Sequence, residues 1–286
     1  MSVAPAGAGR RILIVDDDRA LRHALATLLE EVGHVVEQAG DGSDALVMLN
    51  GGAFDLVLLD IGLPGTSGLD VLARVRAAGS PPLVVMMTAD DTSETLLEAV
   101  RRQAYRYLRK PFAPTAIVGL IEDAFAAAPA ADLPIEVVSA KSEWVEIIAP
   151  CTLRMADRLQ SFMMQLDAGL SEPVRESVAQ AFREMLNNAI EWGGKLDPAR
   201  KVRISCIRAK RLLLYRIADP GEGFDIGKLL HAAISNPDGD PLRHAEVREK
   251  RGIRPGGLGL LLTHSIVDEL IYNETRNEVV FIKYLD

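Results

Sequence analysis

The sequence predicts two α/β domains in one chain: a doubly wound, mostly parallel five-stranded sheet, followed by an α/β sandwich. The chain has 286 residues, 48% of them apolar, which is enough for two separate cores. In the first half, short β-rich runs alternate with amphipathic helical patterns, as in a parallel sheet with crossover helices. In the second half, two strand-like runs are adjacent with no helix between them, which favours an antiparallel sheet.

The first half supplies the strands of the parallel sheet. Apolar residues of the first helix recur at helical spacing, and Gly33 follows them as a helix-ending residue. Such a sheet binds ligands at the carboxyl ends of its strands. The helical positions are Leu21, Leu25, Leu28, Leu29 and Val32. The expected strands are 11–15, 34–39, 55–59, 83–87 and 105–108.

Composition divides the chain into four parts. Residues 1–9 lack any pattern and are expected to form a disordered tail. Alanines and prolines interrupt the pattern before residue 135, so 127–134 is expected to be a linker. The parallel domain is then expected at 10–126 and the sandwich at 135–286.

Charge and cysteine content argue against several classes of protein. The formal net charge of −8 comes without the basic stripe of a nucleic-acid binder, so direct DNA binding is not expected. Cys151 and Cys206 lack the spacing of a zinc site or a disulfide framework, and we expect both to be buried in a cytoplasmic protein. No apolar run approaches the ~20 residues that span a bilayer, so no membrane association is expected.

Polar side chains follow four of the five expected parallel strands. Alone, each has an ordinary explanation, such as a helix cap, a solvated loop or a turn. Together they would place several carboxylates at one edge of one sheet, where repulsion is costly without a cation. Carboxylate and phosphate oxygens are the ligands that Mg²⁺ prefers. These residues are Asp16, Asp17 and Asp18 after the first strand, Asp60 after the third, Thr88 after the fourth and Lys110 after the fifth.

Residues 10–126 resemble the receiver domain of two-component response regulators. The matching segments are "VDD" (15–17), "LLDIGLPGTSG" (58–68), "MTA" (87–89) and "YLRKPF" (107–112). The resemblance implies an upstream sensor histidine kinase as partner. One departure is that "RQAYRYL" lacks the glycine and acidic residues that often precede the tyrosine.

The same resemblance implies the roles of the acidic residues. Asp60 would be the phosphoacceptor, attacking the phosphoryl group of a phosphohistidine or a small phosphodonor. Asp17 and Asp60, with the Gly62 carbonyl, would ligate Mg²⁺, and Asp16 would hold the ion through water.

Three further receiver residues have roles implied by the resemblance. Lys110 would neutralise the phosphate, and Thr88 would hydrogen-bond to it. Tyr107 lies where the family has an aromatic that turns inward in the active state, although an ordinary edge-strand aromatic would fit the same position.

The second half is expected to contain a largely antiparallel sheet covered by helices. On the second of these helices, Glu184 and Asn188 lie four residues apart and therefore share a face. Taken alone, that polar face is typical of solvent exposure as well as of a site. The expected strands are 201–208 and 212–219, and the expected helices lie near 152–168, 173–192 and 258–269.

A glycine-rich segment, Gly256, Gly257 and Gly259, comes directly before the last expected helix. A helix start offers unpaired N–H groups and a positive dipole end to an anion, and glycine allows a phosphate to approach the backbone closely. The segment follows neither the dinucleotide-binding nor the P-loop pattern.

Residues 135–286 resemble the Bergerat-type ATPase superfamily shared by histidine kinases and DNA gyrase, and most of all the anti-sigma-factor serine/threonine kinases. Glu184 with Asn188 matches the N box, the 219–223 segment the first glycine box, and Gly256 with Leu260 the second. The resemblance implies Mg²⁺ and ATP as cofactors. Glu184 would be the general base, and Trp192 replaces a frequent histidine. The implied nucleotide-binding residues are Asn188 on the ATP-bound Mg²⁺, Asp219 on the adenine amino group, and Gly221, Gly223, Gly256, Gly257 and Gly259 around the nucleotide.

Two functions stay open from the sequence. In the first, phosphorylation of Asp60 controls a serine/threonine kinase that acts on an anti-sigma-factor-antagonist-like protein and could also bind a sigma factor. In the second, ATP sets the shape of a surface that sequesters a partner without phosphoryl transfer. The presence of Glu184 favours the first, and a homodimer is compatible with either. A histidine kinase is not expected, because no histidine lies on a dimerisation helix before the ATP domain.

Overall fold

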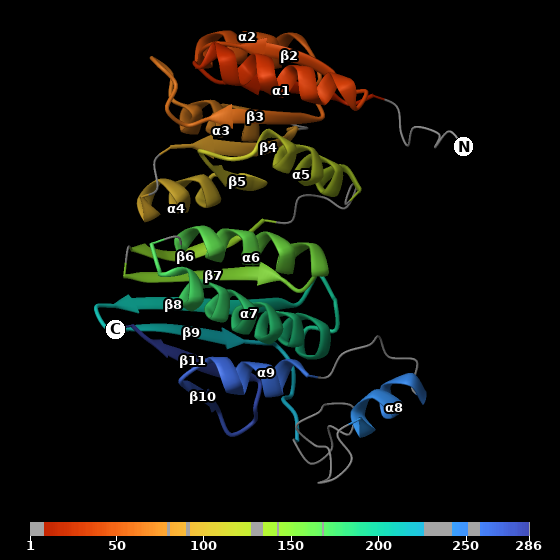
Figure 1. The fold of residues 1–286 in the computed structure, drawn as a ribbon, viewed down its shortest axis with the longest axis vertical. Coiled ribbons are helices and arrows are strands. Elements are labelled where there is room, and N and C mark those ends of the chain that lie inside the picture. Colours follow the sequence, from red (N-terminus) through yellow and green to blue (C-terminus); the bar gives the residue numbers. More distant parts are fainter. Residues whose placement is uncertain are drawn as a thin grey trace. The chain divides into compact units, whose positions relative to one another are not determined.

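The chain divides into two compact units, Met1–Leu133 and Pro134–Asp286, in a computed structural model (Figure 1). Each unit is a sheet with helices packed against it. Most of the expected tail and linker lies outside the described residues. The structure describes residues 9–78, 81–89, 92–126, 134–141, 143–167, 169–225, 242–250 and 258–285.

The first unit contains a five-stranded sheet in the order β2-β1-β3-β4-β5, and every pair is parallel. The doubly wound sheet is therefore confirmed, with each strand within one residue of its expected bounds. Its central strands are buried on both faces, as in parallel sheets covered by helices. The strands are β1 (Arg11–Val15), β2 (Val35–Ala39), β3 (Leu56–Asp60), β4 (Leu83–Thr88) and β5 (Arg106–Arg109).

Helices cover both faces of this sheet. Helix α1 begins where Asp18 accepts hydrogen bonds from the backbone N–H groups of Ala20 and Leu21, at 2.8 and 3.2 Å. Residues of α1 and α5 pack against alternate residues of β1, β3 and β4 in one buried cluster. Helix α4 is followed by Gln103 at φ +61°, a conformation that usually takes glycine. The helices are α1 (Arg19–Glu31), α2 (Gly42–Gly51), α3 (Gly68–Arg76), α4 (Ser93–Arg101) and α5 (Pro114–Ala126).

The second unit contains a six-stranded sheet in the order β10-β11-β9-β8-β7-β6, and every pair is antiparallel. This confirms the α/β sandwich. Strands β8 (Lys201–Ala209) and β9 (Leu212–Ala218) are the two that the sequence predicts individually. The other four are β6 (Glu136–Lys141), β7 (Trp144–Pro150), β10 (Glu269–Tyr272) and β11 (Glu278–Tyr284).

Three helices of the second unit cover one face of the sheet (Figure 1). The helix expected at 258–269 ends at Ile266, because 269–272 pairs with β11 as an antiparallel strand. The helix expected at 173–192 changes to a π-helical turn, η1 (Ala189–Gly193), after Asn188. The covering helices are α6 (Leu153–Leu166), α7 (Glu172–Asn188) and α9 (Gly259–Ile266), and α8 (Arg243–Lys250) is a further described helix. Among the helices that the structure describes, none is both long and apolar enough to cross a membrane.

A buried polar pair joins α6 to the sheet. The Tyr215 hydroxyl of β9 donates a 2.6 Å hydrogen bond to Asp167 Oδ2, and the two residues are 0% and 4% exposed. Burial raises the pKa of Asp167 to about 6, and the Tyr215 hydrogen bond partly opposes that rise. Because the unfolded carboxyl ionises at lower pH, this group costs stability as pH rises from about 4 to about 6.

Replacing Tyr215 by phenylalanine is expected to destabilise the second unit by about 2 kcal/mol, because it leaves a buried carboxylate without its donor. Asp167→Asn keeps an acceptor for the hydroxyl and removes the charge, so it should cost less and should flatten the loss of stability between about pH 4 and 6. Denaturant unfolding of the three chains at several pH values measures both effects. A Tyr215→Phe variant as stable as the parent would contradict this role.

Candidate functional site

The carboxyl edge of the parallel sheet brings together the acidic residues directly after β1 and at the last position of β3. Oxygen atoms of Asp16, Asp17 and Asp60 all lie within 4.8 Å of one another. Asp16 and Asp60 are buried, at 0% and 5% exposure, whereas Asp17 is exposed to solvent. This donor set of three carboxylates, open on one side, fits a hard divalent cation such as Mg²⁺.

Lys110 lies between the two buried carboxylates. Its Nζ is 2.6 Å from Asp16 Oδ2 and 3.2 Å from Asp60 Oδ1. The backbone positions it, because the Lys110 N–H donates a 2.7 Å hydrogen bond to the Thr88 carbonyl at the end of β4. The ammonium thus contacts two of the three carboxylates, and one positive charge beside three negative ones leaves an excess of negative charge that a cation can neutralise.

Burial and charge shift the pKa values of this edge. Burial raises the pKa of Asp60, and nearby Lys110 and the Gly62 N–H oppose the rise while Asp16 adds to it. Burial alone would lower the pKa of Lys110, but its ion pairs with Asp16 and Asp60 outweigh burial, and the net pKa is raised. Lys110 therefore stays charged at neutral pH, and ionisation of Asp60 is opposed until further positive charge arrives.

The remaining receiver residues lie around this edge. Thr88 is buried at the end of β4, one strand from Asp60, since Asp60 pairs in register with Met87. Tyr107 is buried on β5 opposite Met86. Gly62 follows Asp60 by two residues, and its N–H is directed at the Asp60 carboxylate.

In the second unit, Glu184 and Asn188 lie on α7, which packs beside α9. Gly259 at the first turn of α9 touches the Glu184 carboxylate so closely that any Cβ there would collide with Glu184 Oε2. Within the described part of the chain, no hydrogen bond or ion pair engages the side chains of Glu184 or Asn188. Both are half-buried, so they can serve a ligand without breaking an existing interaction.

Asp219, directly after β9, lies against the π-helical turn η1. Gly193 packs on the Asp219 carboxylate, and a Cβ at Gly193 would overlap it. The Gly221 N–H donates a 2.7 Å hydrogen bond to Asp219 Oδ1. Burial raises the pKa of Asp219, while Gly221 and Arg200 oppose the rise. Oδ2 has no hydrogen-bond partner among the residues described, so the carboxyl keeps an acceptor for a ligand.

Gly223 lies against the turn between β10 and β11. It has φ +80°, and a Cβ there would overlap the Thr275 carbonyl oxygen. Asn277 of that turn accepts the Asp219 N–H on its backbone carbonyl and donates from Nδ2 to the Gly221 carbonyl. The turn and the 219–223 segment are therefore packed backbone to backbone.

Comparison with known proteins identifies both units. Residues 12–122 match the family model described as "Response regulator receiver domain", and residues 150–283 match "Histidine kinase-like ATPase domain". The chain is 34% identical over 161 residues to the transcriptional regulatory protein FixJ of Bradyrhizobium diazoefficiens, covering 56% of this chain and 75% of that protein. The chain belongs to the response regulators.

Other transcriptional regulators match over smaller shares of their length. The DNA-binding transcriptional regulator NtrC of Azospirillum brasilense is 30% identical over 179 residues, which cover 60% of this chain and 37% of that protein. The transcriptional regulatory protein DltR of Streptococcus agalactiae is 40% identical over 102 residues, 36% of this chain and 46% of that protein. This chain thus spans less than half the length of these two relatives. A CheY-like receiver domain protein from Methanospirillum hungatei is 28% identical, with a TM-score of 0.41, covering 42% of this chain and 95% of that one.

Sequence reasoning missed three residues of this response regulator's second site: Gly193, Arg200 and Asn277. The Gly193–Gly194 pair after α7 was a usable signal, because two glycines at a helix end indicate close approach. Arg200 donates a 2.8 Å hydrogen bond to the Gly193 carbonyl, which no sequence pattern indicates.

Of the predicted residues, Gly256 and Gly257 lie outside the described part. Trp192, which stands where the resembling family often has histidine, is 44% exposed.

Proposed function

We propose that this response regulator is a phosphorylation-controlled serine/threonine kinase of the anti-sigma-factor type. The receiver implies a cognate sensor histidine kinase. The ATPase-like unit would take ATP and Mg²⁺ and phosphorylate an anti-sigma-factor-antagonist-like protein, with a sigma factor as a second partner. The fusion of these two units in one chain is what supports control of one by the other.

Phosphoryl transfer to the receiver would use the charged edge of the parallel sheet. The Asp60 carboxylate would attack phosphorus while the bond to the donor's leaving group breaks, and the Lys110 ammonium would stabilise charge on the phosphoryl oxygens. Asp16, Asp17 and Asp60, with the Gly62 carbonyl, would hold Mg²⁺. When bound, Mg²⁺ would supply electrostatic stabilisation of the same oxygens. Thr88 and Tyr107 would respond to the new charge, which is about −1.5 to −2.

Kinase activity would rest on α7 and the segments beside it. Asp219, with one carboxylate oxygen held by Gly221, would accept the adenine amino group, and Asn188 would reach the ATP-bound Mg²⁺. Gly221, Gly223, Gly256, Gly257 and Gly259 would let the backbone approach the nucleotide. Glu184 would take the proton of the attacking serine or threonine hydroxyl. The observation that carries this proposal is the unengaged Glu184 carboxylate, which shares a helix face with Asn188 and lies at the start of α9.

The alternative is a binding module in which ATP only shapes a surface that sequesters a partner. The binding module needs the nucleotide-binding residues but not a general base. The two functions therefore predict different effects of a substitution at Glu184 and the same effect of a substitution at Asp219.

Glu184→Gln is expected to keep ATP affinity and to lower transfer of the γ-phosphoryl group to a serine-bearing antagonist protein by about 10²-fold or more, because a positioned base is lost. The measurement is labelling of that protein by γ-labelled ATP, with and without prior acetyl phosphate treatment of the receiver. Glu176→Gln, an exposed position on the same helix, is the matched control. ATP binding without transfer by the parent chain would favour the binding module. Transfer that survives in Glu184→Gln would exclude Glu184 as the base.

A further inference from the structure

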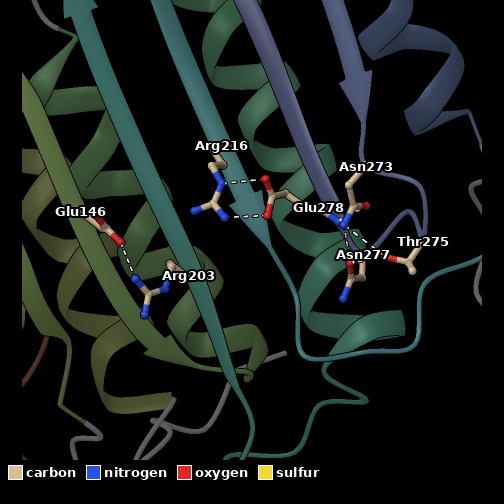
Figure 2. A network of polar contacts seen from close by, with 7 residues as sticks. All are labelled: Glu146, Arg203, Arg216, Asn273, Thr275, Asn277 and Glu278. Atoms are coloured by element: carbon tan, nitrogen blue, oxygen red, sulfur yellow. Dashed lines mark hydrogen bonds and ion pairs between the residues drawn. The ribbon is translucent and has the colours of Figure 1, made fainter.

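The turn between β10 and β11, residues 273–277, is held together by its own side chains (Figure 2). Asn277 Oδ1 accepts two hydrogen bonds of 2.7 Å, one from Asn273 Nδ2 and one from the Thr275 hydroxyl. Since both donors face Oδ1, the orientation of the Asn277 side-chain amide is fixed. Its Nδ2 is therefore the atom that faces the 219–223 segment.

Asn277 contacts that segment at two points. Its backbone carbonyl accepts the Asp219 N–H at 2.8 Å, and its Nδ2 donates to the Gly221 carbonyl at 3.1 Å. The N–H of the same Gly221 holds Asp219 Oδ1 at 2.7 Å. The Asn277 side chain thus holds the carbonyl of the residue whose N–H orients the Asp219 carboxylate, and the two groups lie in adjacent peptide planes joined at the Gly221 Cα.

The turn has other support, so its folding does not depend on the Asn277 side chain alone. The Arg276 N–H donates to the Asn273 carbonyl at 3.1 Å, and the Asn273 N–H donates to the Glu278 carbonyl at 3.2 Å. Next to it, Arg216 and Glu278 form a two-fold ion pair with distances of 2.7 and 2.6 Å (Figure 2). Loss of the Asn277 side-chain donor would leave these interactions in place.

We propose that Asn277 is a positioning residue for purine recognition: it acts through Gly221 to aim the Asp219 carboxylate at an exocyclic amino group. This rests on the proposed nucleotide function. Adenine carries an amino group at the position where guanine carries a carbonyl, so a correctly aimed carboxylate favours adenine and repels guanine. Asn277 would therefore contribute to the preference for ATP over GTP, and not only to affinity.

Asn277→Asp is the sharpest test, because aspartate keeps the acceptor for Asn273 and Thr275, removes the donor to Gly221 and turns a carboxylate oxygen toward the Gly221 carbonyl. The expected result is about a tenfold loss of ATP affinity, little change in GTP affinity, and so a smaller ATP-to-GTP ratio. Titrations with fluorescent ATP and GTP analogues on the full chain measure the ratio. Glu274→Gln, exposed in the same turn, is the control and should leave the ratio unchanged.

Other results test the positioning role independently. Equal losses for ATP and GTP, or no loss, would overturn the positioning role. If Asn277→Asp unfolds, Thr275→Val removes one of the two donors that fix the amide and should lower the ratio in the same direction by a smaller factor. In the nucleotide-free chain, hydrogen exchange of the Gly221 amide should be faster in Asn277→Asp than in the parent, which separates failure of this inference from failure of the ATP function.

Discussion

Replacing Asp60 by asparagine is expected to make the receiver unit more stable and, at the same time, unable to accept a phosphoryl group. Asp60 and Asp16 are both buried and share one ammonium, that of Lys110. The substitution removes one of two like charges, and Lys110 keeps its 2.6 Å ion pair with Asp16. No buried ammonium is therefore left unpaired, and the electrostatic cost of the site falls.

The gain in stability of Asp60→Asn should depend on pH. Because burial raises the pKa of Asp60 above its ordinary value of 3.8, the unfolded chain releases this proton at lower pH than the folded chain. The free energy of unfolding therefore falls as pH rises through that interval, and the loss persists at higher pH. Asparagine does not titrate, so the advantage of Asp60→Asn should be larger at neutral pH than below the ordinary pKa of 3.8, where the carboxyl is protonated in both the folded and the unfolded chain.

Calorimetry of the full chain, with acetyl phosphate labelling alongside, measures both effects. At neutral pH without Mg²⁺, the free energy of unfolding of Asp60→Asn should exceed that of the parent by more than the ±0.5 kcal/mol typical of substitutions at exposed sites. Asp123→Asn, at an exposed position on α5, is the charge-matched control. Mg²⁺ at 100 times its Kd should stabilise the parent by about 2.7 kcal/mol, and it should stabilise Asp60→Asn by less. Retained labelling would exclude Asp60 as the acceptor, and lower stability would contradict the repulsion argument.

The parallel sheet was predictable because its signals are local. Each central strand is a continuous apolar run, and each functional residue lies at the carboxyl end of its strand or directly after it. Knowing that the sheet is parallel is therefore enough to place Asp16, Asp60 and Lys110 at one edge. The sequence does not contain the distances, and it does not show that Lys110 lies nearer to Asp16 than to Asp60.

The second site was less predictable because its contacts join segments that are far apart in the chain. Asn277 and Gly221 are 56 residues apart, and neither the turn nor strand β10 has a distinctive pattern. The apolar helical pattern after Gly259 continues past Ile266, which is why the expected helix ran into β10. The π-helical turn that brings Gly193 to Asp219 depends on packing and has no periodicity of its own.

Among the glycines that the structure describes in the second unit, Gly223 is the one at which replacement by alanine is expected to have the largest structural effect. Gly223 combines two constraints: φ +80°, which costs an L-residue about 1–2 kcal/mol, and a backbone contact with the Thr275 carbonyl that leaves no room for a Cβ. Gly65 has the first constraint alone, since it has φ +75° and a Cβ there would meet no atom within 4 Å. Comparing the two alanine variants therefore separates backbone strain from close approach.

Gly65→Ala should cost the receiver unit about 1–2 kcal/mol, and Gly223→Ala should cost the second unit about 4 kcal/mol or more, since the turn and the 219–223 segment must move apart. That separation also removes the Asn277 contacts to Asp219 and Gly221, so ATP affinity should be lost together with stability. Denaturant unfolding and ATP titration on the same preparations measure both. A Gly223→Ala chain that loses no more stability than Gly65→Ala and still binds ATP like the parent would show that the turn does not shape the nucleotide segment.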